Sequence, residues 1–427
     1  MAAPTDGGVT RGRTSHGWAT DGRTPHGRIP AGWAARIARG TPPHRNRAVD
    51  ALRAMAMVGV VTGHWLVTGL TVDPRGALHQ ASPLSAMPVF APLTWVLQTL
   101  GLFFFVSGYA ATRGLTRALS GGASVRSWLA SRVRRILPPI ALFVGAWWLL
   151  RLALEASRVE PQTLRTISKL MISPLWFVLV LVLLTLVTPV LVRVEASVGT
   201  VAALAALAVV AAVDVAQFAA GVAIPRWLAH LSVPAAWLVP YLLGVARAQG
   251  RLGDRRLGPA MAAVGAVAGL VLIGWAGYPA SMVGVPGDGR SNIAPPSLLA
   301  VALALVQIGL ALACWTRLSR LLERPRWWAV VVVLNLSAMT VFLWHQSALL
   351  GVSAVGRALL GAPLGLVGPP SGSAWLLGRL LWLPAFAGAL ALLWLLTRRV
   401  EHLGRMPGAG RLPRRRARPP LVVAPDP

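Results

Sequence analysis

The chain has 427 residues, of which 55% are hydrophobic and only 13% are charged. Ordinary soluble domains carry about 25% charged residues, so this composition excludes a soluble fold. The formal charge of +28 lies at the ends of apolar blocks and in two Pro/Gly-rich tails, which is typical of membrane topology and of contact with anionic lipids. Nucleic-acid binding is not expected, because such proteins gather basic side chains on one folded surface.

The chain is predicted to be an all-α, polytopic membrane bundle of about ten transmembrane helices. Residues 1–47 are basic and are expected to form a disordered cytoplasmic arm, residues 48–400 the membrane domain, and residues 401–427 a disordered Arg/Pro-rich tail. Crossing a ~30 Å hydrocarbon core takes about 20 apolar residues of helix, and blocks of that length recur along the chain. The predicted spans are 50–72, 89–112, 136–154, 170–192, 197–219, 227–247, 258–279, 296–316, 328–351 and 374–397.

The distribution of Lys and Arg predicts the orientation of the bundle. The loops on one side, together with both tails, carry far more of these residues than the loops on the other side. Cytoplasmic loops hold such an excess, so both termini are predicted to be cytoplasmic, which requires an even number of spans. Lysine is nearly absent beside abundant arginine, as in proteins from GC-rich bacterial genomes. We therefore expect a multi-pass protein of the plasma membrane within a bacterial cell envelope.

The first predicted span contains three ionisable residues, Asp50, Arg53 and His64. Such groups are costly inside a membrane and are candidates for function. At ~100° per residue, Arg53 and His64 share one helix face, and a rise of about 16 Å separates them. His64 is therefore expected near the membrane midplane, Arg53 near the cytoplasmic mouth, and Asp50 within reach of Arg53. A histidine in a span often only packs against a neighbouring helix, but the aligned arginine favours a functional role.

Other polar residues fall in the predicted outer half of the membrane. Asp214 is expected to pair with His230 or Arg379, because an isolated carboxylate at this depth is costly. The alternative is that these groups and Gln217 line an acceptor cavity. The single cysteine, Cys314, excludes a disulfide within the chain and a cysteine-based metal site, and no metal site is predicted.

Five segments resemble, in order, the motifs of the acyltransferase family 3 membrane enzymes. The first resembles Asp-Gly-Leu followed by Arg, ten residues and His, with Ala51 in place of Gly. The second resembles Phe-Phe-x-x-Ser-Gly-aromatic and the third Arg-x-x-Arg-Ile-x-Pro. The last resembles Tyr-Leu-x-His, with Phe342 in place of Tyr. The segments are residues 49–64, 103–109, 132–138, 175–177 and 342–345.

The resemblance implies transfer of an acyl group, usually acetyl, from acyl-coenzyme A to a hydroxyl, often on a sugar. It implies no bound cofactor, since acyl-coenzyme A is a substrate. An alcohol attacks a thioester poorly until a base removes its proton, and imidazole, with an unperturbed pKa of ~6.5, suits that role. The resemblance makes His64 the candidate general base, with Arg53 as the second catalytic residue of the same motif. A route through an acyl-histidine stays open.

The donor site is expected at the cytoplasmic helix ends. Coenzyme A carries phosphates, which guanidinium groups bind well, so Arg53, Arg132 and Arg135 are the candidate donor-binding residues. The alternative is that the second arginine group, Arg132, Arg134 and Arg135, only anchors the topology. Ser107 is expected either to line a tunnel for the pantetheine arm or to pack between helices beside Gly108.

Trp176, His345 and Asp50 are candidates for acceptor contacts or for structural roles. His345 is expected toward the outer end of its span, with a structural or acceptor-binding role rather than base catalysis. The expected partners are acyl-coenzyme A, a sugar-containing acceptor and membrane lipids, and the sequence indicates no oligomeric state. The alternatives are a glycan or lipid transporter or exporter without acyl-transfer chemistry and a non-catalytic scaffold. No inverted repeat supports the first, and the second does not explain the aligned Arg53 and His64.

Overall fold

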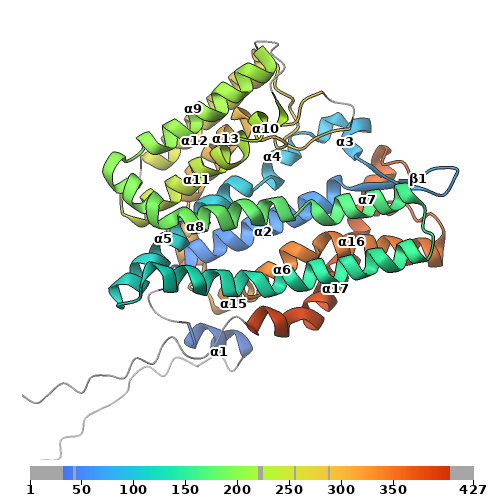
Figure 1. Cartoon of the computed structure of the whole chain (residues 1–427), viewed down its shortest axis with the longest axis horizontal. Coiled ribbons are helices and arrows are strands. Elements are labelled where there is room, and N and C mark those ends of the chain that lie inside the picture. Colours follow the sequence, from blue (N-terminus) through green and yellow to red (C-terminus); the bar gives the residue numbers. More distant parts are fainter. Residues whose placement is uncertain (1–31, 42–44, 220–224, 254–255, 287–288, 404–427) are drawn as a thin grey trace, which may run out of the picture.

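A computed structural model describes residues 32–41, 45–219, 225–253, 256–286 and 289–403. Nearly all of its regular structure is helical, and most of the long helices run along one direction of the molecule (Figure 1). The elements are α1 (Trp33–Arg39), α2 (Arg47–Val67), β1 (Gly69–Val72), β2 (Leu78–Ala81), α3 (Pro83–Ala86), η1 (Pro88–Phe90), α4 (Leu93–Leu97), α5 (Leu100–Ser120), α6 (Val125–Ala156), α7 (Pro161–Ile172), α8 (Leu175–Val198), α9 (Val201–Asp214), η2 (Val215–Ala219), α10 (Arg226–Ala229), α11 (Ser232–Ala248), α12 (Leu257–Gly274), α13 (Leu298–Ala313), α14 (Trp315–Leu321), α15 (Pro325–Leu336), α16 (Ala338–Leu360) and α17 (Gly372–Leu403).

The all-α polytopic fold predicted from the sequence is confirmed. Within the described residues, 8 helical segments are long and apolar enough to cross a membrane, or up to 9 if the pair α13–α14, bent by 58°, is one span. All of them overlap predicted spans. Helix α2 is not among the eight, because Asp50, Arg53 and His64 lower its mean hydropathy. The count of ten and the cytoplasmic location of the termini stay predictions.

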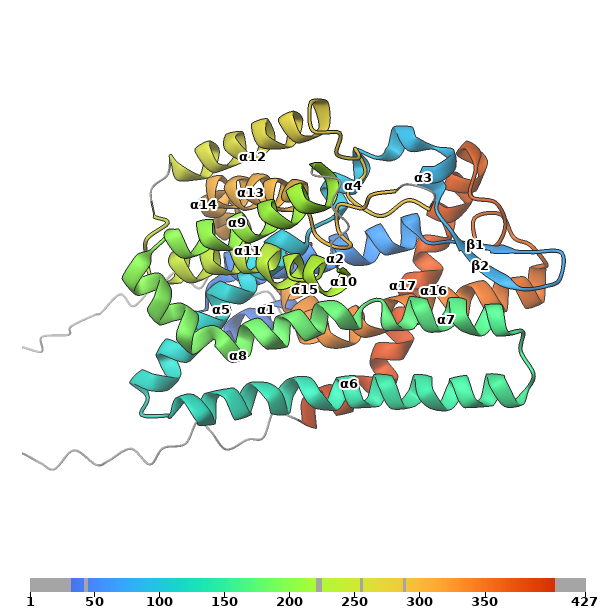
Figure 2. The same ribbon diagram turned by 45° about the horizontal axis from the view of Figure 1, so that its top comes forward.

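The bundle has two distinct ends, which Figures 1 and 2 show on opposite sides of the molecule. One end carries the β1–β2 hairpin, helix α3 and the turn between α6 and α7, and we call it the hairpin end. The other end carries α1, α14 and the turn between α5 and α6. Because α2 runs between the two ends, it connects them through the interior of the bundle.

The hairpin is a feature that the sequence analysis missed. Helix α2 ends at Val67, earlier than predicted, and the chain then turns back as the antiparallel pair β1–β2. Asp73 stabilises the turn by accepting hydrogen bonds from the backbone N–H of Ala77 at 2.8 Å and of Arg75 at 2.9 Å. Its other oxygen lies 3.1 Å from Nε2 of His79. These bonds, that from Ala77 most of all, lower the pKa of Asp73 below its ordinary value.

Helix α2 is the central helix of the bundle. It begins at the N-cap Asn46, whose side-chain oxygen accepts a hydrogen bond from the backbone N–H of Val49 at 3.3 Å. Along its length it packs against α5, α15 and α16, and most of its residues are buried. Ionisable side chains on α2 are therefore surrounded by protein rather than by lipid, which is where a membrane protein tolerates them.

Helices α5 and α11 pack unusually closely, because each brings a glycine to the contact. A Cβ at Gly108 of α5 would collide with the backbone of Tyr241, and a Cβ at Gly244 of α11 would collide with the backbone of Phe105. Small residues let the backbones of two membrane helices approach in this way. By contrast, α6, α12 and α17 are mostly exposed and form the outer surface of the bundle.

Part of the basic arm predicted to be disordered is helical in this structure. Helix α1 packs against α15, and Ala35 is buried there. The indole N–H of Trp328 donates a hydrogen bond to the hydroxyl of Thr41 at 2.7 Å, which fixes the end of this segment. The rest of the arm lies largely outside the described residues, as does nearly all of the tail from residue 401, so their disorder stays a prediction.

Candidate active site

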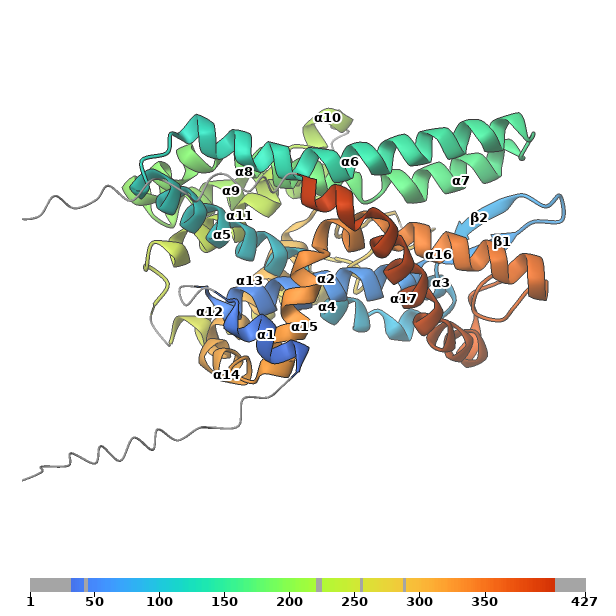
Figure 3. The ribbon, with the colours of Figure 1, turned by 90° about the horizontal axis from the view of Figure 1, so that it is seen from below.

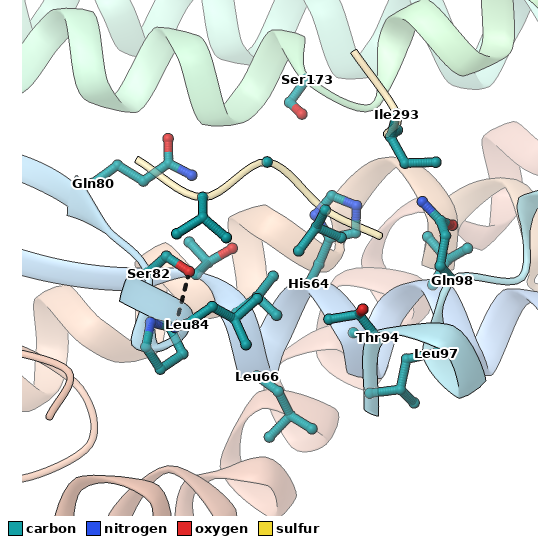
Figure 4. A pocket seen from close by; sticks show the side chains of 18 of the residues that line it. His64, Leu66, Gln80, Ser82, Leu84, Thr94, Leu97, Gln98, Ser173 and Ile293 are labelled. Atoms are coloured by element: carbon teal, nitrogen blue, oxygen red, sulfur yellow. Dashed lines mark hydrogen bonds between the residues drawn. The ribbon is translucent and has the colours of Figure 1, made fainter. Parts of the chain in front are cut away.

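His64 lies on the wall of a cavity with a volume of about 700 Å³. The side chain points from α2 into this space, with Thr94 and Gln98 of the α4 segment on one side and Ser82 on the other (Figure 4). Ser173, at the junction of α7 and α8, faces His64 across the cavity. The wall is mostly apolar, with a few polar groups around the imidazole, as in many small-molecule sites.

Gln346 of α16 holds the imidazole of His64. Its amide Nε2 lies 2.9 Å from His64 Nδ1 and 3.5 Å from the hydroxyl of Thr68, the C-cap residue of α2, one turn beyond His64. When the amide nitrogen faces Nδ1, it donates to an unprotonated Nδ1. After a half rotation the amide oxygen faces Nδ1 and accepts its proton, which leaves Nε2 with a free lone pair. Gln346 therefore couples its own orientation to the tautomer of His64.

The sequence analysis predicted His345 toward the outer end of its span, but the structure places it beside His64. The predicted span is divided at Ser337, so α16 continues to Leu360 and His345 falls in its first half. The two imidazole rings are 5.0 Å apart in an edge-to-face arrangement. His345 is fully buried, its Nδ1 lies 2.7 Å from the backbone oxygen of Phe342, and its Nε2 has no hydrogen-bond partner among the described residues.

Arg53 and Asp50 lie at the opposite end of α2 from His64. Asp50 is buried, its two oxygens lying 2.5 Å from Nε of Arg45 and 3.9 Å from Nη1 of Arg53. Asn335 of α15 donates a hydrogen bond to the backbone oxygen of Asp50 at 2.7 Å. The predicted contact between Asp50 and Arg53 is thus confirmed, and Arg45 is a second arginine at the same carboxylate.

Arg132 is the member of the second arginine group that turns toward α2. It is half-buried on α6, lies 5.2 Å from the ring centroid of Trp128, and is close enough to Arg53 and Arg135 for electrostatic repulsion. Arg135 is exposed on the same helix. Arg132 forms no ion pair with a carboxylate of the described residues, so within the described part of the chain its positive charge is not compensated.

The structure does not bring the predicted donor-binding residues to the cavity at His64. The lining of the cavity includes none of Arg53, Arg132, Arg135 and Ser107. Ser107 is half-buried on α5, where its neighbour Gly108 makes the close contact with α11. The two predicted groups are therefore separated along α2, with the imidazole at the cavity and the arginines at the other end.

Trp176, a candidate for acceptor contacts, does line the cavity, as does His345. Trp176 is half-buried at the start of α8, and its ring centroid is 6.2 Å from that of Phe177. Aromatic faces of this kind stack on apolar faces of ligands, and the indole N–H offers a hydrogen-bond donor.

The predicted pairing of Asp214 with His230 or Arg379 is wrong. Asp214 instead accepts hydrogen bonds from the hydroxyl of Tyr278 at 2.7 Å and the backbone N–H of Leu298 at 2.8 Å, and it lies 3.8 Å from Arg290. Tyr278 and Arg290 belong to the loop between α12 and α13, and Leu298 is the first residue of α13. The sequence analysis inferred correctly that the Asp214 carboxylate needs a partner, but residues of a long loop provide it instead of residues of another span.

Arg379 has a different partner near the site. It is fully buried on α17, and its Nη2 donates a hydrogen bond to the backbone oxygen of Thr68 at 2.7 Å. Its guanidinium also lies over the rings of Trp375 and Phe386, at 4.9 Å and 5.4 Å. Arg379 therefore holds the end of α2 one turn after His64.

Sequence reasoning missed Gln346 and Thr68 as parts of the site. Thr68 stands four positions after His64, on the same helix face, and Gln346 directly follows His345 in the last motif. Both positions were visible in the sequence. What was missing was the distance between α2 and α16, which only the fold provides.

A model of the family described as "Acyltransferase domain" matches residues 46–398, most of the chain. No curated protein and no solved structure matches the chain.

Proposed function

The chain belongs to acyltransferase family 3, and on that premise we propose that this membrane enzyme transfers an acyl group from cytoplasmic acyl-coenzyme A to a hydroxyl. The acyl group is usually acetyl in the family, and the proposed acceptor is a glycan or a glycosylated molecule. The observation that carries the proposal is His64, which faces a cavity of about 700 Å³ with its Nδ1 held by Gln346. A positioned imidazole beside a substrate-sized cavity is what general-base catalysis requires.

In the proposed reaction, His64 takes the proton of the acceptor hydroxyl through its free nitrogen. The alcohol oxygen then attacks the thioester carbonyl, an ester bond forms and the carbon–sulfur bond breaks. The leaving thiolate of coenzyme A receives the proton from the imidazolium. This sequence uses Gln346 after the half rotation of its amide, because the amide oxygen then accepts the Nδ1 proton both in the active tautomer and in the imidazolium.

The arginines at the other end of α2 support the cytoplasmic donor site. Arg53 and Arg132 lie near one another there, and Arg132 lacks a carboxylate partner among the described residues. Phosphate groups of coenzyme A would neutralise this excess charge. With the phosphates at Arg53 and Arg132, the acyl-pantetheine arm has to extend along α2 by about 16 Å to bring the thioester to His64.

The acceptor is proposed to enter from the hairpin end. The cavity that His64 faces is walled there by β2, α3, α4 and the loop between α12 and α13. Donor and acceptor would then approach His64 from opposite ends of α2, so that the acyl group can cross the membrane domain while coenzyme A stays in the cytoplasm.

The alternative, a glycan or lipid transporter without acyl-transfer chemistry, has one structural feature in its favour, the broken pair α13–α14. Transporters often place their sites at broken helices near the midplane. Here the bend of 58° lies at Cys314, and neither α13 nor α14 contributes to the cavity lining. Membership of an acyltransferase family and the position of His64 favour the enzyme.

The experiment is to incubate the purified protein in nanodiscs with coenzyme A carrying a radiolabelled acetyl group and with pooled cell-envelope glycans. The proposal predicts that label appears on the glycans and that free coenzyme A is released in equal amount. Transport of labelled glycan across proteoliposomes without acetylation would support the transporter instead. Retention of all label on coenzyme A, with intact donor binding, would contradict the proposed acceptor class.

A further inference from the structure

The mouth of the cavity at His64 has two chemically different edges. One edge is polar and is formed by Gln80 of β2 and Lys169 of α7, both exposed. The other edge is apolar and is formed by Phe90, Leu93 and Leu380, which line the cavity and are still 38%, 44% and 43% exposed. A ligand in this mouth therefore meets polar groups on one side and hydrocarbon on the other.

The apolar edge continues onto the outer surface of the bundle. Figure 3 shows α17 passing the α3–α4 segment at the hairpin end. Immediately outside the cavity, Val96 of α4 is 69% exposed and Leu381 of α17 is 80% exposed. In a membrane protein, exposed apolar side chains of this kind face lipid. The cavity is therefore bordered by lipid-facing helices, and its apolar edge is continuous with the surface that the bilayer covers.

The same apolar character extends inward toward His64. Leu97 of α4 and Leu376 of α17 continue the wall from Leu93 and Leu380. Lys169 is the only charged side chain among the described lining residues. A purely polar saccharide would bury its hydroxyls against this hydrocarbon without hydrogen-bond partners, at a cost for each group. An alkyl tail would instead be stabilised there by burial of its own apolar surface.

We propose that the acceptor is an amphiphilic alcohol, a hydroxylated head group on a hydrocarbon tail, which enters the cavity sideways from the bilayer between α4 and α17. The tail lies against Phe90, Leu93 and Leu380, and the head group reaches Gln98 and His64 with the polar edge beside it. This inference rests on the proposed function for the role of His64, and it narrows the acceptor to a molecule resident in the membrane.

The test uses a dodecyl glucoside with a diazirine in its tail, added to the full chain in phosphatidylcholine nanodiscs. After illumination, mass spectrometry locates the labelled residues. Label is expected on α4 and α17 at the cavity edge, and unlabelled dodecyl glucoside is expected to reduce it while methyl glucoside does not. Label spread evenly over the outer helices α6 and α12, unaffected by dodecyl glucoside, would overturn the proposal.

Two matched pairs of variants sharpen the result. Leu380→Trp and Leu93→Trp fill the apolar edge, whereas Leu381→Trp and Val96→Trp add the same side chain on the lipid-facing side. We expect the first two to reduce competable labelling by about fivefold or more, and the latter two to leave it unchanged. Equal effects within each pair would overturn the proposal. Thermal unfolding of every variant checks that the fold persists. The matched pairs are Leu380→Trp with Leu381→Trp on α17 and Leu93→Trp with Val96→Trp on α4, so if a variant of one pair unfolds, the other pair still gives the comparison.

Coenzyme A release, measured with the same glucosides and acetyl-coenzyme A, separates this inference from the proposed function. Labelling that dodecyl glucoside reduces, without release of coenzyme A, would support the amphiphile site and contradict acyl transfer. Release that is equal for methyl and dodecyl glucoside, without competable labelling, would leave acyl transfer in place and remove the amphiphile site.

Discussion

The amide nitrogen of Gln346 lies 2.9 Å from Nδ1 of His64, which joins α16 to the imidazole carried by α2. A glutamine can present either a donor or an acceptor to that nitrogen, whereas a carboxylate can only accept and an aliphatic side chain can do neither. The contact therefore decides which nitrogen of His64 is free to remove a proton. The tautomer of His64 can therefore be changed by substituting Gln346, with the histidine itself left in place.

Gln346→Leu is expected to lower kcat for acyl transfer by roughly ten- to a hundredfold with little change in KM for acetyl-coenzyme A, because the imidazole loses its acceptor at Nδ1. Gln346→Glu is expected to retain more activity than Gln346→Leu, since the carboxylate accepts the Nδ1 proton. Steady-state kinetics of the purified variants measures this. Equal activity of Gln346→Leu and the wild type would show that the contact has no role in catalysis.

Asp50→Asn is expected to weaken donor binding by several-fold, because Arg45 and Arg53 lose the carboxylate that holds them. Binding of acetyl-coenzyme A, followed by isothermal titration calorimetry, measures the effect. Asp73→Asn is the matched control, since Asp73 is a carboxylate of the hairpin, at the opposite end of α2 from the arginines. A similar loss in both variants would point to a general destabilisation instead of a donor-site effect.

Arg132→Leu is expected to raise the Kd for coenzyme A by about tenfold, the effect of losing one charge-assisted phosphate contact. Arg134→Leu, two positions along the same helix and exposed, is expected to bind the donor nearly as the wild type does. The same titration, repeated at high salt, tests whether the difference is electrostatic. An equal loss in both variants would indicate general electrostatic attraction instead of a phosphate contact of Arg132, and no loss in either would leave the arginines as topology anchors only.

Gly108→Leu is expected to destabilise the bundle by about 1–3 kcal/mol, because a side chain there would push α5 away from the backbone of Tyr241. Gly351→Leu on α16 serves as the control, since apart from the adjacent backbone of α16 itself no atom lies within 4 Å of the position that its Cβ would take. Thermal unfolding in detergent compares the two. Equal melting temperatures would mean that α5 and α11 do not need their close approach.

Much of the fold could be predicted because its determinants are local. Apolar blocks of span length gave the helices, and the spacing of Asp50, Arg53 and His64 on one helix placed these side chains correctly along α2. Helical geometry alone fixes such relationships. The close contact at Gly108 was likewise one of the two roles expected for the Ser107–Gly108 pair.

The remaining features depend on contacts between distant segments, which periodicity does not encode. The partner of Asp214 comes from the loop that carries Arg290, and that of His64 comes from α16. The break at Ser337 shifted His345 from the predicted outer end of a span to the side of His64. The hairpin was missed because its short strands continue an apolar stretch of span-like composition.

The most direct test of the account is acceptor-dependent release of coenzyme A from acetyl-coenzyme A by the wild type and by His64→Asn in nanodiscs, with pooled cell-envelope glycans as acceptor. The account predicts that the substitution lowers release by about a hundredfold or more, while acetyl-coenzyme A binding and thermal unfolding stay unchanged. Release by His64→Asn at the wild-type rate would contradict it, because the imidazole would then have no part in the transfer.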